Sequence, residues 1–405
     1  MFPPGAPSWL EVLKHLWMPG IWVFVVALLL TLIGTPIFRW VALRRGITDK
    51  PDQAVKIHKT PIPYLGGCSI WLAWTGSLLV NFLLNGTEFG KAEVALLAGG
   101  AVAFVTGLLD DIYDLAPRKK LLGQVLAGAV LLAAGIRWAA FPAYLPLLHF
   151  SEDFWLVWAI CLAVHFMVVV GATNATNLMD GLDGLASGVA AIVSVGFLLL
   201  ATSLTAYANK AWFSDPVQYE YSSLIITVAF ALAGATIGFL PYNFNPARIF
   251  MGDAGSVFIG YVIAAMMIMF STHFGMVKWF VGALFIFGVP IFDTALAVIR
   301  RVVNRRPIMA ADRSHLYNQL VDRLHLSVPS TVILFYGMSL LSAAAGLLML
   351  YLPGRYAILV YVGLAAAFMV IVWRLGFLRL TPEEKAAADR FLDSHRSVFA
   401  RRKAP

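Results

Sequence analysis

Charged residues are scarce in this chain. Asp, Glu, Lys and Arg together make up 13% of its 405 residues, whereas hydrophobic residues make up 60%, and the mean hydropathy is +0.79. A soluble domain carries roughly a quarter of charged residues. The composition therefore excludes an ordinary soluble domain and indicates a polytopic membrane protein.

Cysteine is almost absent as well. Both of the 2 cysteines, Cys68 and Cys161, fall within apolar runs, so neither a disulfide framework nor a metal site is supported. The first apolar run is too long for a secretory signal and contains Pro36 and Arg39. Because no repeat, low-complexity tract or soluble segment interrupts the chain, we interpret residues 1–405 as one integral membrane domain.

Apolar runs recur along the whole chain. A run needs roughly 20 residues to cross a hydrocarbon core about 30 Å thick. We find about eleven, near 21–43, 66–84, 93–109, 121–136, 154–172, 184–204, 221–240, 254–272, 277–299, 328–352 and 355–376. Lipid-embedded segments must satisfy their own backbone groups, so these runs predict helices. The predicted fold class is all-α, with about 11 transmembrane helices.

Lysine and arginine are distributed unevenly between the two sets of connecting loops. Of the 30 Lys and Arg residues, 23 fall on one side of the predicted spans and six on the other, with Arg39 inside a span. Basic residues accumulate in cytoplasmic loops, which predicts an external N-terminus and a cytoplasmic C-terminus in the plasma (inner) membrane. The net charge of +8 then reflects this bias and contact with anionic lipid, and it does not indicate nucleic-acid binding.

The unusual polar clusters all fall in the loops predicted to be cytoplasmic. These loops are 44–65, 110–120, 173–183, 241–253 and 300–327, and they are rich in Asp, Asn and Gly next to span ends. The loops of the opposite side contain nothing comparable. We therefore expect the five loops to form one site on the cytoplasmic face.

Acidic residues at membrane depth are the core of this expected site. Asp110 and Asp111 end the third run, and Asp253 opens the eighth. Such acids cost about 2.5–3.5 kcal/mol each on insertion and need a partner. Asp and Asn oxygens suit Mg²⁺, which completes its coordination with substrate phosphates; Mn²⁺ is the expected substitute. The stretch NATNLMDGLDGLASG adds four polar residues spaced by three, Asn174, Asn177, Asp180 and Asp183.

Five motifs in this order resemble the polyprenyl-phosphate N-acetylhexosamine-1-phosphate transferases. They are DKP with KxH and GG at 49–67, DDxxD followed by Lys120 and Gln124, NxxNxxDGxDGLA at 174–186, PxNxxPAxxFMGDxGS at 241–256, and PxFD followed by DRxHL at 290–316. The resemblance covers residues 45–325, leaving two further helices and a basic tail in 328–405. It implies that a UDP-sugar and a polyprenyl (undecaprenyl) phosphate give a polyprenyl-diphospho-sugar and UMP. Family members often form homodimers.

The resemblance also implies roles for individual residues. Asp253 and Asn177 match Mg²⁺ contacts, and Lys120 matches a diphosphate contact. Asp110, with Asp111 beside it, matches the residue proposed to accept the proton of the lipid phosphate. A phosphate monoester is largely ionised at pH 7, so an orienting role for Asp110 is the alternative. Further expected substrate contacts are Asp183 and Phe250 at the uracil, and Asn174, Asp180 and Asn243.

The chain departs from the family pattern in the loop at 300–327. Relatives that start common antigen and teichoic acid linkage units carry His-x-His-His there, and the MurNAc-pentapeptide enzyme carries three consecutive histidines. Here the segment is His315-Leu316-Tyr317-Asn318, so only His315 carries over. Arg306 is expected to hold the sugar-linked phosphate, because guanidinium groups bind phosphate bidentately. The PIFD, IRR and DRxHL segments around this loop resemble the common-antigen and teichoic type of enzyme. They predict UDP-GlcNAc as the donor, with a UDP-linked deoxy-acetamido sugar as the second choice.

Two other classes of membrane protein remain as alternatives. An intramembrane prenyltransferase also binds Mg²⁺-diphosphate with Asp-rich motifs, but its motifs are expected to have a spacing of four and to lack MGDAGS. A lipid-linked sugar flippase predicts polar and basic residues along a path through the spans. The spacing of three and the one-sided polar clusters favour the transferase.

Overall fold

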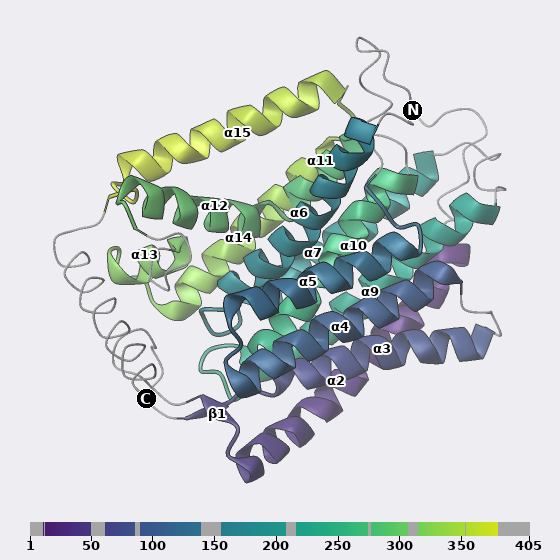
Figure 1. Cartoon of the computed structure of the whole chain (residues 1–405), viewed down its shortest axis with the longest axis horizontal. Coiled ribbons are helices and arrows are strands. Elements are labelled where there is room, and N and C mark those ends of the chain that lie inside the picture. Colours follow the sequence, from purple (N-terminus) through teal and green to yellow (C-terminus); the bar gives the residue numbers. More distant parts are fainter. Residues whose placement is uncertain are drawn as a thin grey trace.

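The structure, a computed structural model, describes residues 11, 13–49, 61–85, 90–138, 155–207, 216–273, 277–306, 315–352 and 354–379. Within these ranges almost all regular structure is helical (Figure 1). The exception is a two-stranded antiparallel ladder, β1 (Thr48–Asp49) with β2 (Ile62–Pro63). The all-α prediction is confirmed. The motif residues within 50–60, the DR of DRxHL and the basic tail from 380 onward lie outside the described residues.

The helices of the described residues occur in a simple order along the chain. A π-helical turn, η1 (Leu13–Trp17), precedes α2 (Met18–Arg45), α3 (Gly66–Asn85), α4 (Lys91–Tyr113), α5 (Pro117–Ala133), α6 (Trp155–Met179), α7 (Leu185–Tyr207), α9 (Pro216–Asn243), α10 (Gly252–His273), α11 (Val277–Ile286), α12 (Gly288–Val303), α13 (Leu316–Asp322), α14 (Val328–Leu348) and α15 (Gly354–Arg374). These helices contain the apolar runs of the sequence.

Eight of the described helices are long and apolar enough to cross a membrane: α2, α3, α4, α6, α7, α9, α10 and α14. A ninth span results if the bent pair α11 and α12 crosses as one unit. The run at 121–136 falls on α5, which has 17 residues, and the run at 355–376 falls on α15, whose apolar part is Leu359–Arg374. The chain is therefore a multi-span membrane protein, while the count of 11 and the orientation of the termini stay predictions.

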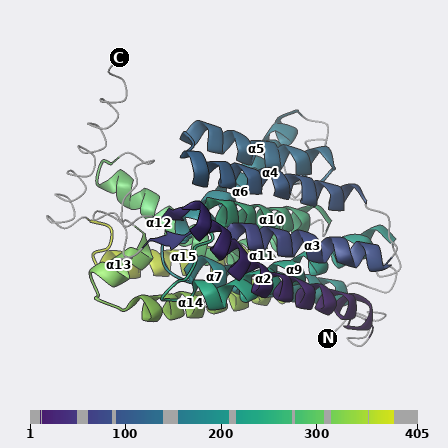
Figure 2. The ribbon, with the colours of Figure 1, turned by 90° about the horizontal axis from the view of Figure 1, so that it is seen from below.

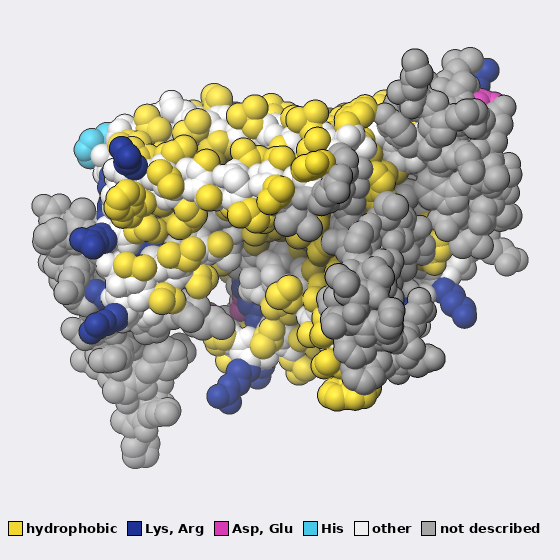
Figure 3. Space-filling model, turned by 90° about the horizontal axis from the view of Figure 1, so that it is seen from above, with side chains coloured by type: hydrophobic (Ala, Val, Ile, Leu, Met, Phe, Trp, Pro, Cys, Tyr) yellow, Lys and Arg dark blue, Asp and Glu magenta, His cyan; other side chains and the backbone are white. Residues whose placement is uncertain are grey.

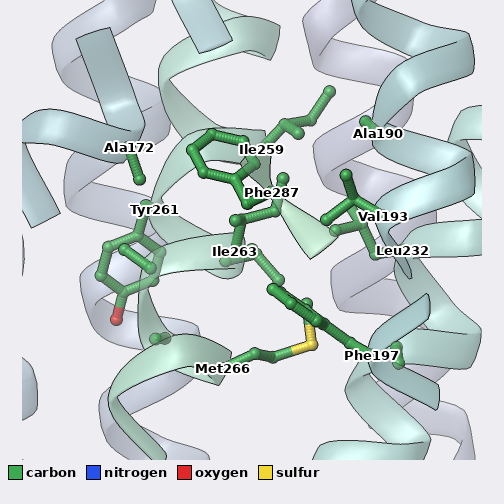
Figure 4. Packing of buried hydrophobic residues seen from close by; sticks show 14 of the residues in the cluster. Ala172, Ala190, Val193, Phe197, Leu232, Ile259, Tyr261, Ile263, Met266 and Phe287 are labelled. Carbon is green, nitrogen blue, oxygen red and sulfur yellow. The ribbon is translucent and has the colours of Figure 1, made fainter. Parts of the chain in front are cut away.

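Helix α10 lies at the centre of the bundle. Residues 254–271 of α10 are all buried, whereas only 22% of the most apolar 18-residue stretch of α2 is buried. Figure 4 shows α10 residues such as Tyr261 and Met266 among side chains of neighbouring helices, including Phe197 of α7. Figure 2 shows α4 and α5 as a layer beside α6 and α10, and α10 contacts both α4 and α6. The core therefore holds the end of α10, where Asp253 lies, against several helices.

The bent pair α11 and α12 has an identifiable cause. The axes of its two halves differ by 72°, and Pro290 lies in the first turn of α12. A proline removes a backbone donor and its ring clashes with the carbonyl group four residues earlier, here that of Ile286. Helix α12 buries Asp293 and Arg300 and exposes Val302, as expected of a helix whose apolar side faces lipid.

One end of the bundle collects the ends of the motif-bearing helices. In Figure 1 this is the left end, near β1 and α13. Backbone bonds join the segments there, since Gly66 N–H donates to the Phe250 carbonyl at 2.9 Å and Phe250 N–H donates to the Pro63 carbonyl at 2.8 Å. In the view of Figure 3, Lys and Arg side chains gather toward the same end, and hydrophobic side chains cover the flank.

Candidate active site

Lys120 is the centre of a polar cluster at this end of the bundle. Its ammonium group lies 2.8 Å from Oδ2 of Asp110 and also contacts Oδ2 of Asp253. It donates to Oδ1 of Asn177 at 3.3 Å. Four helices, α4, α5, α6 and α10, thus each supply one of these side chains, and the structure brings together four residues that the sequence predicted for one site.

The turn between α4 and α5 places two of these residues. Helix α4 ends because Asp114 adopts a left-handed conformation, with φ of 51°. Helix α5 begins with Pro117 in its first turn, where a proline is pre-organised for the helix. Asp110 accepts a bond from Leu115 N–H at 2.9 Å inside this turn. The short connection therefore brings the last turn of α4 against Lys120 in the first turn of α5.

Asp253, Ser256 and Lys120 together determine the orientation of the Asn177 amide. The Nδ2 group of Asn177 donates to Oδ1 of Asp253 at 2.7 Å and to Oγ of Ser256 at 3.0 Å. With both donors used, Oδ1 of Asn177 faces Lys120. Ser256 is not among the site residues predicted from the sequence, although its position three residues after Asp253, on the same helix face, was a usable signal.

Asp111 has different partners from its neighbour Asp110. Its Oδ1 accepts the backbone N–H of Asp253 at 2.8 Å, and its Oδ2 accepts that of Ala254 at 2.9 Å. Tyr64, which the sequence did not indicate, donates its hydroxyl to the Asp111 carbonyl at 3.1 Å. The side chain of Asp111 therefore contacts the first turn of α10.

A second polar group joins the segments at 183–187 and 243–250. Oδ2 of Asp183 accepts bonds from Asn245 Nδ2 and Ala247 N–H, both at 2.9 Å. Asn243 is buried, and its Oδ1 accepts from Gly184 N–H and from the Ser187 hydroxyl. Its Nδ2 donates to Ile249 O at 3.1 Å. These bonds fix the loop that leads to Phe250, while the predicted nucleotide contacts stay predictions.

Asn174 and Asp180 flank Asn177 on the motif segment. The Nδ2 group of Asn174 donates to Oε1 of Gln124 at 2.9 Å, linking α6 to α5 one turn beyond Lys120. Burial raises the pKa of the Asp180 carboxyl well above its usual range. The charges of Asp253, Asp111 and Asp183 raise it further. Negative charge is thus crowded around this end of α6.

His315 lies on the other side of the motif segment. Its Nδ1 lies 2.7 Å from Oδ2 of Asp293 in α12, and both side chains are buried. Its ring stacks on that of Tyr317, whose hydroxyl donates to the Leu178 carbonyl at 3.0 Å. The loop at 300–327 therefore contacts the segment of Asn177 through Tyr317. Arg306 follows the end of α12 and is partly buried. Its backbone N–H donates to the Arg301 carbonyl at 2.8 Å.

The oxygen atoms around Lys120 suit a hard divalent cation. Asp253 and Asn177 both direct an oxygen atom at the same ammonium group, and the donor set of carboxylate and amide oxygens is that preferred by Mg²⁺. Among the described residues, no three or more His, Cys, Asp or Glu side chains group as a protein metal cage. Mg²⁺ usually takes one or two carboxylates plus substrate phosphates, so the residues fit a shared ion.

Known proteins with similar sequences are transferases. The family described as Glycosyl transferase family 4 matches residues 94–271. A probable undecaprenyl-phosphate N-acetylglucosaminyl 1-phosphate transferase of Bacillus subtilis is 35% identical over 298 residues, covering 74% of this chain and 76% of that protein. A decaprenyl-phosphate N-acetylglucosaminephosphotransferase of Mycobacterium tuberculosis H37Rv is 30% identical, covering 80% and 82%. A phospho-N-acetylmuramoyl-pentapeptide-transferase of Bacillus pumilus is 30% identical, covering 80% and 94%.

The fold and these similarities define a multi-span membrane transferase. The chain belongs to glycosyl transferase family 4. The predicted family is confirmed, and so is its type, because the Bacillus subtilis relative named for N-acetylglucosamine is 35% identical, whereas relatives named for the muramoyl-pentapeptide are 30% and 32% identical.

Proposed function

We propose that this protein transfers N-acetylglucosamine-1-phosphate from UDP-GlcNAc to a polyprenyl phosphate of the undecaprenyl class, releasing UMP. The observation that carries the proposal is the convergence of Asp110, Asp253 and Asn177 on Lys120 at one end of the bundle. The relatives named for transfer of this sugar phosphate to polyprenyl phosphates support it.

The proposed reaction requires that the charge of the phosphoryl group is neutralised and that the two substrates are aligned. Phosphoryl transfer depends on positioning and on stabilising the charge of the transferred group along an in-line path. Lys120 is suited to neutralise a diphosphate oxygen, and Asp110, held by Lys120 and Leu115 N–H, is suited to orient the acceptor phosphate. Asp253 and Asn177 would hold Mg²⁺, or Mn²⁺ in its place, and the ion would supply charge neutralisation at the diphosphate.

The two substrates approach from different environments. A hollow in the apolar flank of Figure 3 shows basic and acidic atoms on its floor, so charged groups are accessible beside surface that suits a prenyl chain. The polar loops with Asp183 and Phe250 suit a uridine nucleotide from the cytoplasm. In this proposal the cell-envelope polysaccharide is started on the cytoplasmic face of the plasma membrane.

A donor panel tests the proposal directly. Purified protein with undecaprenyl phosphate and Mg²⁺ is assayed for UMP release from UDP-GlcNAc, UDP-MurNAc-pentapeptide and a UDP-deoxy-acetamido sugar. We expect turnover of UDP-GlcNAc, no use of the pentapeptide donor, and no UMP without the acceptor lipid. Pentapeptide turnover at the rate of UDP-GlcNAc would show that the His315 loop does not select the donor. No UMP from any donor would refute the proposed reaction.

A further inference from the structure

Both carboxylate oxygens of Asp111 accept hydrogen bonds from backbone N–H groups. They accept the N–H groups of Asp253 and Ala254 at 2.8 and 2.9 Å. The first N–H groups of a helix have no partner within the helix, and Gly252 at the start of α10 has no side chain to supply one. The carboxylate of Asp111, on α4, therefore caps α10 from a neighbouring helix, where its negative charge is also favourable.

The two adjacent acids of α4 point to different places. Successive residues of an α-helix are rotated by about 100°. Because of this rotation, the side chain of Asp110 contacts Lys120, whereas the side chain of Asp111 faces the first turn of α10. Lys120 contacts the side chain of Asp253, and Asp111 contacts the backbone from which that side chain projects.

The surrounding backbone leaves this contact little freedom. Gly252 has φ of +69°, and a Cβ there would lie 2.6 Å from Oδ2 of Asp111. One turn earlier on α4, a Cβ at Gly107 would collide with the carbonyl oxygen of Asp253. On the far side, Gly67 N–H donates to the Met251 carbonyl at 2.8 Å. Helix α4 and the first turn of α3 thus hold residues 251–254 from two sides.

We propose that Asp111 is a positioning residue: it fixes the backbone of Asp253 so that the Asp253 carboxylate faces the diphosphate site, and it takes no part in proton transfer. The role in catalysis rests on the proposed function, but the capping contact does not. Residues that support a metal-binding side chain typically change metal affinity or activity by about 10–100-fold when they are replaced.

The test compares Asp111→Asn and Asp111→Ala with Asp114→Asn. Asp114 is the matched control, because it lies three residues away with an exposed side chain. Apparent affinity for Mg²⁺ and kcat at saturating Mg²⁺ are measured by UMP release. Hydrogen exchange of a peptide containing Asp253 and Ala254 is measured without substrate. We expect both Asp111 variants to lose protection there and to need about 10–100-fold more Mg²⁺, with kcat at saturating Mg²⁺ within about 3-fold of the parent.

The outcomes separate the alternatives. A fall in kcat of more than about 100-fold that excess Mg²⁺ does not restore would assign Asp111 to the chemical step and overturn the proposal. Unchanged exchange and unchanged Mg²⁺ dependence in both variants would overturn it as well, because the contact would then hold nothing. A parent protein that releases no UMP, with the exchange effect present, would leave the cap in place and refute the proposed function instead.

Discussion

Replacing Lys120 by Met is the most direct perturbation of the site. Met keeps the length and the apolar stem of the lysine side chain but removes the ammonium group, which contacts Asp110, Asp253 and Asn177. Removing a preorganised donor from a charge-stabilising site typically lowers kcat by about 10²–10³-fold, or about 2.7–4 kcal/mol. We expect Lys120→Met to fall in this range.

The same change also affects stability. Asp110 and Asp253 share one partner and so lie within roughly 6 Å of each other, and two unit charges at that distance repel by about 3 kcal/mol at an effective dielectric constant of about 20. Solvent weakens this repulsion, because 29% of the Asp253 side chain is exposed. We expect a loss of about 1–2 kcal/mol in the free energy of unfolding, and partial recovery in Mg²⁺, which would replace the missing positive charge.

Lys119→Met is the matched control. Lys119 is the preceding residue on α5, and its side chain is exposed. We expect it to keep parental UMP release and thermal stability, measured with UDP-GlcNAc and undecaprenyl phosphate in detergent. The reasoning is refuted if Lys120→Met retains more than about a tenth of the parental kcat, or if Lys119→Met loses as much activity as Lys120→Met.

Three further predictions concern neighbouring residues. Asp253→Asn should lower UMP release by at least about 100-fold in a monodisperse protein, and a chelator should stop the parent until Mg²⁺ is restored; activity in excess chelator contradicts the shared ion. Gly252→Ala should destabilise by about 1–2 kcal/mol from the left-handed φ alone, and an unchanged melting temperature speaks against this geometry. His315→Ala removes the imidazole partner of Asp293 within a buried pair and should cost about 1–3 kcal/mol, so thermal unfolding at the parental temperature excludes a structural role for the pair.

Hydropathy was enough to predict the long helices, for a physical reason. A segment of lipid-embedded chain must bond its own backbone, so an apolar run of sufficient length specifies a helix without knowledge of its neighbours. Helix α10 shows the limit, because the burial of all its residues from 254 to 271 depends on the helices around it. The bend of α11 and α12 could be read only in part, since Pro290 indicates a kink but not its angle.

The assembly of the site was predictable, but the orientation of its side chains was not. The one-sided loops indicated that Asp110, Lys120, Asn177 and Asp253 belong together. Which of two adjacent acids faces Lys120 depends on the rotation of α4 against α5 and α10, which tertiary packing sets. From the sequence, Asp110 and Asp111 could be interpreted only as a pair. In the structure, Asp110 contacts the side chain of Lys120, whereas Asp111 accepts hydrogen bonds from the backbone of α10.

Membrane orientation is the remaining prediction that bears on the whole site. Helix α7 begins at Leu185, beside the motif segment, and its 23 residues extend about 34 Å to Tyr207, while α9 returns to Asn243. The structure thus places 241–247 and the start of α9 at opposite ends of the bundle.

Single cysteines, on a background lacking Cys68 and Cys161, turn this arrangement into a measurement. If the basic loops are cytoplasmic, a cysteine within 241–247 should react with an impermeant thiol reagent only from the cytoplasmic side. One within 205–219 should react only from outside. Labelling of the two positions from the same side would mean that α9 does not cross the bilayer. The inference of one cytoplasmic site from five one-sided loops would then fail, because that inference depends on the parity of the spans between them.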